Sequence, residues 1–126
     1  MGVRRYEELQ CWQLARALKK EAYALIDRFP AKRDSNFCDQ LRASARSAPS
    51  NIAEGFGRFR PAEFAHFLQI AKASLVETHN HLQDGLDLGY LSEQEWAVLK
   101  SLTERSIAAT TKLIVYLRGC DGSRFK

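Results

Sequence analysis

Apolar residues recur at every third or fourth position along most of this chain, the spacing that covers one face of an α-helix. Four segments follow the pattern, at about residues 6–29, 36–56, 61–88 and 92–118. Their short links cannot run the length of a helix, so each helix must double back along the one before it. The pattern predicts an all-α fold, an antiparallel up-down-up-down four-helix bundle, with residues 1–126 forming one domain. Residues 119–126 carry no pattern and are expected to be a flexible tail.

The predicted helix ends coincide with residues that favour starts and stops. Pro30 ends the first helix, because proline disfavours the helical conformation of the residue before it. The other ends are marked by capping residues, proline or glycine. These are Ser35 or Asn36 before the second helix, Pro61 at the start of the third, Gly89 at its end, and Ser92 with Glu95 before the fourth.

Pro49 lies in the middle of the second helical segment. Apolar positions keep the helical spacing on both sides of it, whereas two separate helices would be free to lose this phase. We therefore predict one helix that is kinked at Pro49, because proline removes a backbone donor and pushes away the carbonyl of Ala45.

The first helix has more apolar surface than one bundle requires. On a helical wheel Leu9, Trp12 and Tyr23 gather away from the core stripe, and Tyr116 belongs to a similar surplus on the fourth helix. A large apolar patch outside a core favours a protein interface, so these four residues are predicted to mediate self-association. The alternative is that Trp12 and Tyr23 lie half-buried over the edges of the core.

Composition points to an ordinary folded domain of 45% hydrophobic and 27% charged residues. No apolar run approaches the roughly 18 residues of a membrane span, and the first ten residues lack the apolar stretch of a secretory signal. We expect a cytoplasmic protein with no membrane partner. Cys11, Cys38 and Cys120 are widely spaced and odd in number, which does not suit a disulfide framework.

The formal net charge of +4 permits contact with a polyanion. Candidate nucleic-acid contacts are Arg42 and Arg46, one helical turn apart, together with Arg58 and Arg60. The alternative is that these arginines are solvated or paired with neighbouring carboxylates such as Asp39.

The remaining polar motifs favour structural roles. Ser50, Asn51 and Glu54 follow the proline and are predicted to form a structural polar network. Glu63 and His66 have the spacing of a di-iron motif, but only one such pair is present and His66 is expected to face outward. The sequence therefore predicts no metal, cofactor or small-molecule substrate. It also shows no nucleophile with identifiable partners, and we expect no enzymatic activity.

Four motifs resemble those of a known family. They are L-x-x-W at Leu9 and Trp12, P-S-N-I-A-E-G-x-G-R at Pro49–Arg58, E-F-x-x-F-L at Glu63–Leu68, and D-L-G-Y-L-S at Asp87–Ser92. Together they resemble the four-helix-bundle proteins encoded in intervening sequences of bacterial 23S ribosomal RNA genes. The resemblance implies a homo-oligomer, a pentamer above all. It also implies a relationship to the accessory variability determinant proteins of diversity-generating retroelements, which look like basic pentamers that bind nucleic acid and a reverse transcriptase. It supplies no functional residues to transfer.

Two hypotheses follow from the sequence. The first is a non-enzymatic, self-assembling helical bundle that acts as a scaffold or interaction module. The alternative is a nucleic-acid-binding accessory protein that contacts the backbone of RNA or DNA through basic helix faces.

Overall fold

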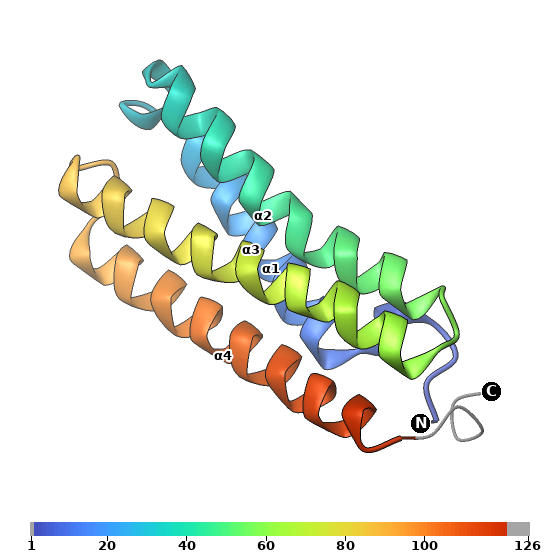
Figure 1. The fold of residues 1–126 in the computed structure, drawn as a ribbon. Coiled ribbons are helices and arrows are strands. Elements are labelled where there is room, and N and C mark those ends of the chain that lie inside the picture. Colours follow the sequence, from blue (N-terminus) through green and yellow to red (C-terminus); the bar gives the residue numbers. More distant parts are fainter. Residues whose placement is uncertain (1, 121–126) are drawn as a thin grey trace.

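The structure, a computed structural model, describes residues 2–120. This part of the chain holds four α-helices and no strand: α1 (Gln10–Ile26), α2 (Ser35–Phe56), α3 (Pro61–Asp87) and α4 (Glu93–Arg118) (Figure 1). Two 3₁₀ turns, η1 (Tyr6–Glu8) and η2 (Ala31–Arg33), precede α1 and α2. The predicted all-α class is confirmed. Most of the predicted flexible tail, from residue 121 on, lies outside the described residues.

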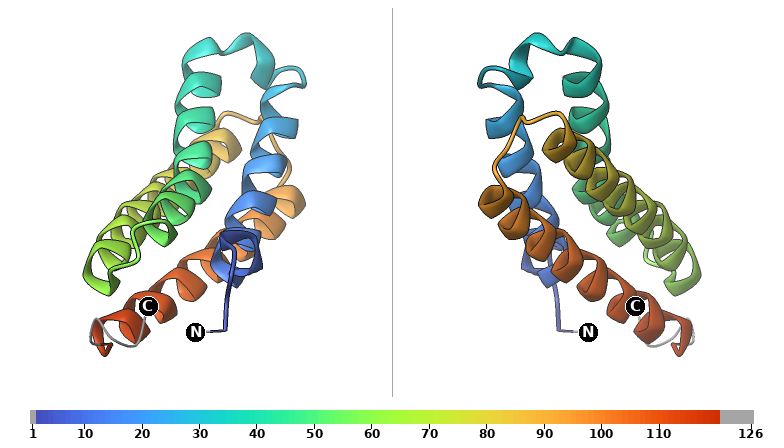
Figure 2. Two further views of the ribbon diagram at one scale, coloured as in Figure 1. Left: turned by 90° about the vertical axis from the view of Figure 1, so that its right-hand side faces the viewer. Right: turned by 90° about the vertical axis from the view of Figure 1, so that its left-hand side faces the viewer.

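Each helix packs against two others, α1 and α3 each contacting both α2 and α4. Figures 1 and 2 show the α1–α2 and α3–α4 connections at one end and the α2–α3 turn at the other. Two long-range contacts tie the first end together. Arg28 Nη1 lies 2.6 Å from Glu95 Oε2, and the Tyr90 hydroxyl donates to Asp34 Oδ2 at 2.7 Å. These contacts are consistent with the predicted up-down-up-down order.

The core is built from the predicted apolar stripes. Fully buried side chains come from every helix, and α3 alone contributes Phe64, Leu68, Leu75 and Leu82. Burial of each of these side chains contributes about 1.5–3 kcal/mol to the stability of the fold. The clearest helical pattern in the sequence therefore lies at the centre of the fold.

Hydroxyl side chains fill core positions that the apolar pattern does not mark. On α4 the buried residues Thr103, Ser106 and Thr110 each donate to the carbonyl four residues earlier, at 2.7–2.8 Å. By contrast, the apolar residues Ile107 and Leu113 of the same helix are only half-buried. Because each hydroxyl is satisfied within its own helix, it packs in the core at little cost.

The helix ends are partly as predicted. Pro61 begins α3, the Ser92 and Glu95 capping box begins α4, and Gly89 follows α3 with a φ of 79°. The predicted cap of α2 at Ser35 or Asn36 is wrong. Its N-cap is Asp34, whose Oδ1 accepts a hydrogen bond from the Phe37 amide at 3.0 Å.

The first helix is shorter than predicted at both ends. The preceding residues form η1, and Leu9 is the extended N-cap of α1. At the other end α1 stops at Ile26, and Phe29, which the predicted stripe included, is 63% exposed. The apolar spacing thus continues beyond the helix itself.

Pro49 lies inside α2, and the helix continues through it from Ser35 to Phe56. A bend at this proline stays a prediction. Near the end of α2 the helix crosses α3 closely, since a Cβ added at Gly55 would lie 2.7 Å from the Phe67 Cβ. This close crossing fixes the position of the α2–α3 turn, where two of the candidate arginines lie.

Candidate functional surfaces

The four candidate arginines fall into two separate groups. Arg42 and Arg46 lie in the middle of α2, where Arg42 Nη1 pairs with Asp39 Oδ1 at 3.1 Å and Arg46 is exposed. Arg58 follows Arg42 by sixteen positions, or about 24 Å of helix and turn. The structure therefore does not bring the four side chains into one patch. Pairing of Arg42 with Asp39 is the arrangement that the sequence left open as an alternative to nucleic-acid contact.

Arg58 and Arg60 lie in the turn between α2 and α3. Arg58 is 3.6 Å from Glu54, and Arg60 is 3.7 Å from Glu63, both as exposed ion pairs. Such pairs contribute little to stability, so a competing phosphate can replace these carboxylates at low cost. This turn is the stronger of the two candidate sites for an anion.

Phe59 stands between these two arginines and was missed by the sequence analysis. Its φ is 64°, the only positive φ of a non-glycine residue in the described chain, and it is 71% exposed. The available signal was an aromatic residue flanked by two arginines directly after Gly57. A hydrophobicity pattern gives such a residue no role, because it belongs to no helix.

Charge is unevenly distributed along the structure. Residues 73–105, which span the end of α3 and the start of α4, carry six Asp or Glu and two Lys or Arg, a formal charge of −4. The rest of the described chain carries eight Asp or Glu and fifteen Lys or Arg, a formal charge of +7. The α2–α3 turn lies at the opposite end from the α3–α4 connection (Figure 1). The positive part also includes Arg28, Lys32 and Arg33 at the α1–α2 connection, so the division follows the sequence more closely than the two ends, and residues 73–105 are the part that would repel a polyanion.

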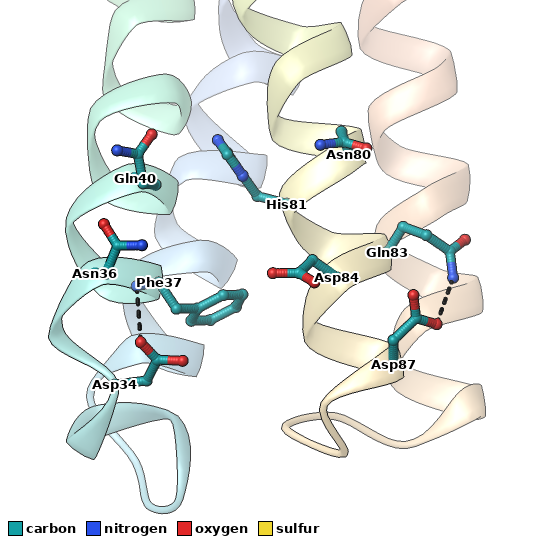
Figure 3. Close-up of a pocket in the computed structure, with 9 residues that line it drawn as sticks. All are labelled: Asp34, Asn36, Phe37, Gln40, Asn80, His81, Gln83, Asp84 and Asp87. Carbon is teal, nitrogen blue, oxygen red and sulfur yellow. Dashed lines mark hydrogen bonds between the residues drawn. The ribbon is translucent and has the colours of Figure 1, made fainter.

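An acidic cleft of about 440 Å³ lies at that other end, between the start of α2 and the end of α3 (Figure 3). Asp34, Asp84 and Asp87 line it, with Phe37 between the helices. Hydrogen bonds from the Tyr90 hydroxyl and the Phe37 amide lower the pKa of Asp34. Three carboxylates make this cleft unfavourable for phosphate, and Asp34 also joins the start of α2 to Tyr90 after α3.

An apolar groove of about 290 Å³ lies between the start of α1 and the end of α4, and we call it the α1–α4 groove. Its apolar lining comes from Leu9, Cys11, Leu113 and Tyr116. Next to Tyr116, which is 42% exposed, Val115 is 65% exposed. The end of α4 thus presents apolar side chains that the single chain leaves in water.

Leu9 does not belong to a surplus exposed face, and that prediction is wrong. It is 5% exposed and packs in the core of the single chain. Its φ and ψ of −73° and 128° are extended rather than helical, so a helical wheel places its side chain incorrectly.

Trp12 and Tyr23 are half-buried against the core. The Trp12 ring meets Tyr6 edge-on, with centroids 5.2 Å apart. This position at the edge of the core is the alternative that the sequence left open for both residues. On α4 Val98, Val115 and Tyr116 are exposed. Association through Leu9, which lines the α1–α4 groove, or through Trp12, Tyr23 or Tyr116 stays a prediction.

The three residues of the predicted polar network do not bond to one another. Asn51 Nδ2 donates to the Ser47 carbonyl at 2.9 Å and lies 3.0 Å from the Ser47 hydroxyl, which accepts from Ser74 at 2.8 Å. Ser50 is exposed, and Glu54 pairs with Arg58. The network therefore joins α2 to α3 through Ser47, and only Asn51 of the predicted set takes part.

The remaining reactive groups occupy structural positions. Burial raises the pKa of the Cys11 thiol to about 11, which keeps it in the less reactive protonated form. His66 is exposed, as expected from the helical wheel.

Within residues 2–120 no three His, Cys, Asp or Glu side chains are grouped to hold a metal ion. In the same residues no helix has both the length and the apolar character of a membrane span.

The family model described as 23S rRNA-intervening sequence protein matches residues 7–112, which include α1, α2, α3 and most of α4. The chain matches no curated protein. The matched residues contain the α2–α3 turn and part of the α1–α4 groove.

Proposed function

Because the chain belongs to the 23S rRNA-intervening sequence protein family, we propose that it is a non-enzymatic, self-assembling helical bundle. It acts in the cytoplasm as a scaffold or interaction module. Its proposed form is a homo-oligomer, specifically a pentamer. Its fold in this proposal is the up-down-up-down bundle with α2 kinked at Pro49. The resemblance noted in the sequence carries the expectation of a homo-oligomer, and the surface of α4 supports it.

The observation that carries the proposal is the apolar end of α4. Tyr116 lines the α1–α4 groove and is 42% exposed, and Val115, its neighbour in the sequence, is 65% exposed. Removing apolar surface from water contributes about 25 cal/mol per Å². A second copy that covers this surface would gain that free energy, which the single chain cannot.

The non-enzymatic part rests on where the shifted pKa values lie. The hydrogen bond from Arg28 lowers the pKa of Glu95 to about 2, and Tyr90 lowers that of Asp34. Both carboxylates join helix ends and accept capping bonds. Structural ion pairs and helix caps account for both shifts, which supports the non-enzymatic part of the proposal.

Light scattering coupled to gel filtration tests the proposal. We expect the wild-type chain to elute as a multimer and Val115→Glu to shift it toward the monomer, because a buried charge opposes association. Val76→Glu is the matched control, since Val76 is 53% exposed on α3, away from the groove. A monomeric wild-type chain at micromolar concentration would remove the proposal.

A second candidate function is a nucleic-acid-binding accessory protein. It is favoured by the segregated charge, +7 against −4, and by the two arginines of the α2–α3 turn. Affinity should fall steeply as salt rises, because binding releases counterions from the phosphates. Charge reversal at Arg58 and Arg60 should weaken binding more than reversal at Arg42 and Arg46. Absence of salt-dependent binding to both RNA and DNA would end this candidate.

A further inference from the structure

The backbone of the α2–α3 turn holds Phe59 in a conformation that suits glycine. At a φ of 64° the side chain of a bulky residue crowds its own backbone, at a cost that glycine avoids. Glycine already stands two positions earlier, at Gly57, so the turn is not short of flexible residues. Stability of the fold alone would therefore favour glycine at position 59 over an aromatic residue.

The Phe59 ring is the most exposed large apolar side chain in the described chain, at 71%. The guanidinium of neighbouring Arg58 stacks on Phe67 instead, 5.0 Å from that ring's centroid. Phe29 makes an instructive contrast. It is 63% exposed at the other end of the molecule, but Arg33 and Lys32 lie 5.3 and 5.8 Å from its ring.

Two arginines, each in an exposed ion pair, adjoin Phe59 in the chain. Arg58 and Arg60 flank it in sequence, and the Arg60 side chain is 80% exposed. Arg60 is also the N-cap of α3, and it places no side-chain acceptor on the amides of the first turn. The positive end of the helix dipole therefore adds to the two guanidiniums at this turn.

We propose that Phe59 stacks on an unpaired base of single-stranded nucleic acid, while Arg58 and Arg60 contact the phosphates on either side. The proposal rests on the second candidate function and names its site. An exposed apolar ring with an arginine on either side in the sequence suits one nucleotide of a strand, whose flat base can stack while the phosphates on its 5′ and 3′ sides are contacted. A duplex fits poorly, because its bases are already stacked on both faces. Since every base has such a face, recognition should tolerate changes in base sequence.

The test is fluorescence anisotropy with labelled oligo-uridine and oligo-thymidine strands at low salt, using the full chain. Phe59→Ala should weaken binding about 5- to 150-fold, the usual contribution of one base stacked on an aromatic residue. Phe59→Trp should restore it, because tryptophan offers a larger stacking face. Phe29→Ala is the matched control and should leave affinity unchanged. A labelled duplex should bind less tightly than either single strand.

A folding control separates loss of the ring from loss of structure. Phe59→Gly suits the positive φ, so it should unfold at no lower temperature than the wild type and still lose affinity to the same extent as Phe59→Ala. Phe59 variants that bind both strands as tightly as wild type would overturn the stacking proposal and leave the nucleic-acid function standing. Failure of the wild type to bind either strand would remove both. A smaller particle mass for Phe59→Ala in light scattering would instead place Phe59 between copies of this chain and overturn the proposal.

Discussion

Gly55 allows the tight crossing of α2 and α3, and replacing it with alanine should destabilise the fold. A Cβ at this position would lie 2.7 Å from the Phe67 Cβ, 2.9 Å from Phe64 Cδ1 and 3.3 Å from the Phe64 carbonyl oxygen. The Phe64 carbonyl oxygen belongs to the α3 backbone and the Phe67 Cβ is bonded to it, so rotation of a side chain cannot move either atom away. The helices themselves would have to separate.

The expected loss combines two opposing effects. Overpacking a core costs about 1–3 kcal/mol. Alanine in place of glycine inside a helix contributes about 1 kcal/mol in the other direction. Because the closest contact is well below any normal carbon–carbon separation, we expect overpacking to dominate, with a net loss of about 1–2 kcal/mol. For a chain of this length that lowers the Tm by about 3–10 °C.

Urea denaturation followed by circular dichroism measures the change in free energy of unfolding, and Gly57→Ala is the matched control. Gly57 has φ and ψ of −74° and −6°, which alanine adopts readily, and the nearest atom to an added Cβ is 3.6 Å away. Gly57→Ala should therefore be neutral or stabilise by up to about 1 kcal/mol. The reasoning is refuted if Gly55→Ala is as stable as wild type, or if both variants lose the same free energy.

Three further outcomes are expected. Glu95→Gln should be less stable at neutral pH. The wild-type carboxylate, whose pKa is lowered from 4.5 to about 2, stabilises the fold above about pH 4.5 and loses this effect as the pH falls toward 2. Acid titration should therefore show a smaller drop for the variant in that window. Thr78→Val should cost about 1 kcal/mol in urea denaturation, because the Thr78 hydroxyl lies 2.8 Å from the Ser74 carbonyl and 2.9 Å from the Ser44 hydroxyl. Gly89→Ala should lower the Tm, because the φ of 79° costs alanine about 1–2 kcal/mol.

The existence and order of the helices follow from the sequence because their apolar stripes are long and regular. The caps that were found also have local signatures, as with Ser92 and Glu95, whose reciprocal bonds are confirmed. The cap at Asp34 was missed because three adjacent polar residues, Asp34, Ser35 and Asn36, can each cap a helix. Asp34 also accepts a hydrogen bond from the distant Tyr90, a contact that the local sequence does not show.

The errors in the core have a different cause. A scale of hydrophobicity places Thr103, Ser106 and Thr110 outside, although they keep helical spacing with Leu99 and Leu102. Their hydroxyls bond to carbonyls of the same helix, which makes them small, nearly apolar groups in the folded state. Only the packed helices reveal that these positions face the core.

The candidate sites were predicted least well because they depend on backbone conformation outside the helices. Leu9 was placed by a wheel although its backbone is extended, and Phe59 was overlooked because a positive φ cannot be seen in a sequence. In both cases the residue was visible in the sequence, but the direction of its side chain was not, because that direction depends on the backbone conformation. Arg58 and Arg60 were selected as charges alone, and the ring between them gives them a more specific chemistry.

The two proposed surfaces use different helices, and this separation bears on how the protein could work. The α1–α4 groove lies between the first and last helices, whereas the turn that carries Phe59 joins the middle two. Both surfaces lie at the same end of the bundle (Figure 1), so they can act together where a copy bound in the groove leaves the Phe59 turn free. One stacked base and two phosphate contacts give weak binding, but several identical turns in one assembly raise the effective concentration for a strand that reaches more than one of them. Self-assembly would then supply the affinity that a single turn lacks, and the scaffold and nucleic-acid hypotheses would describe two steps of one function.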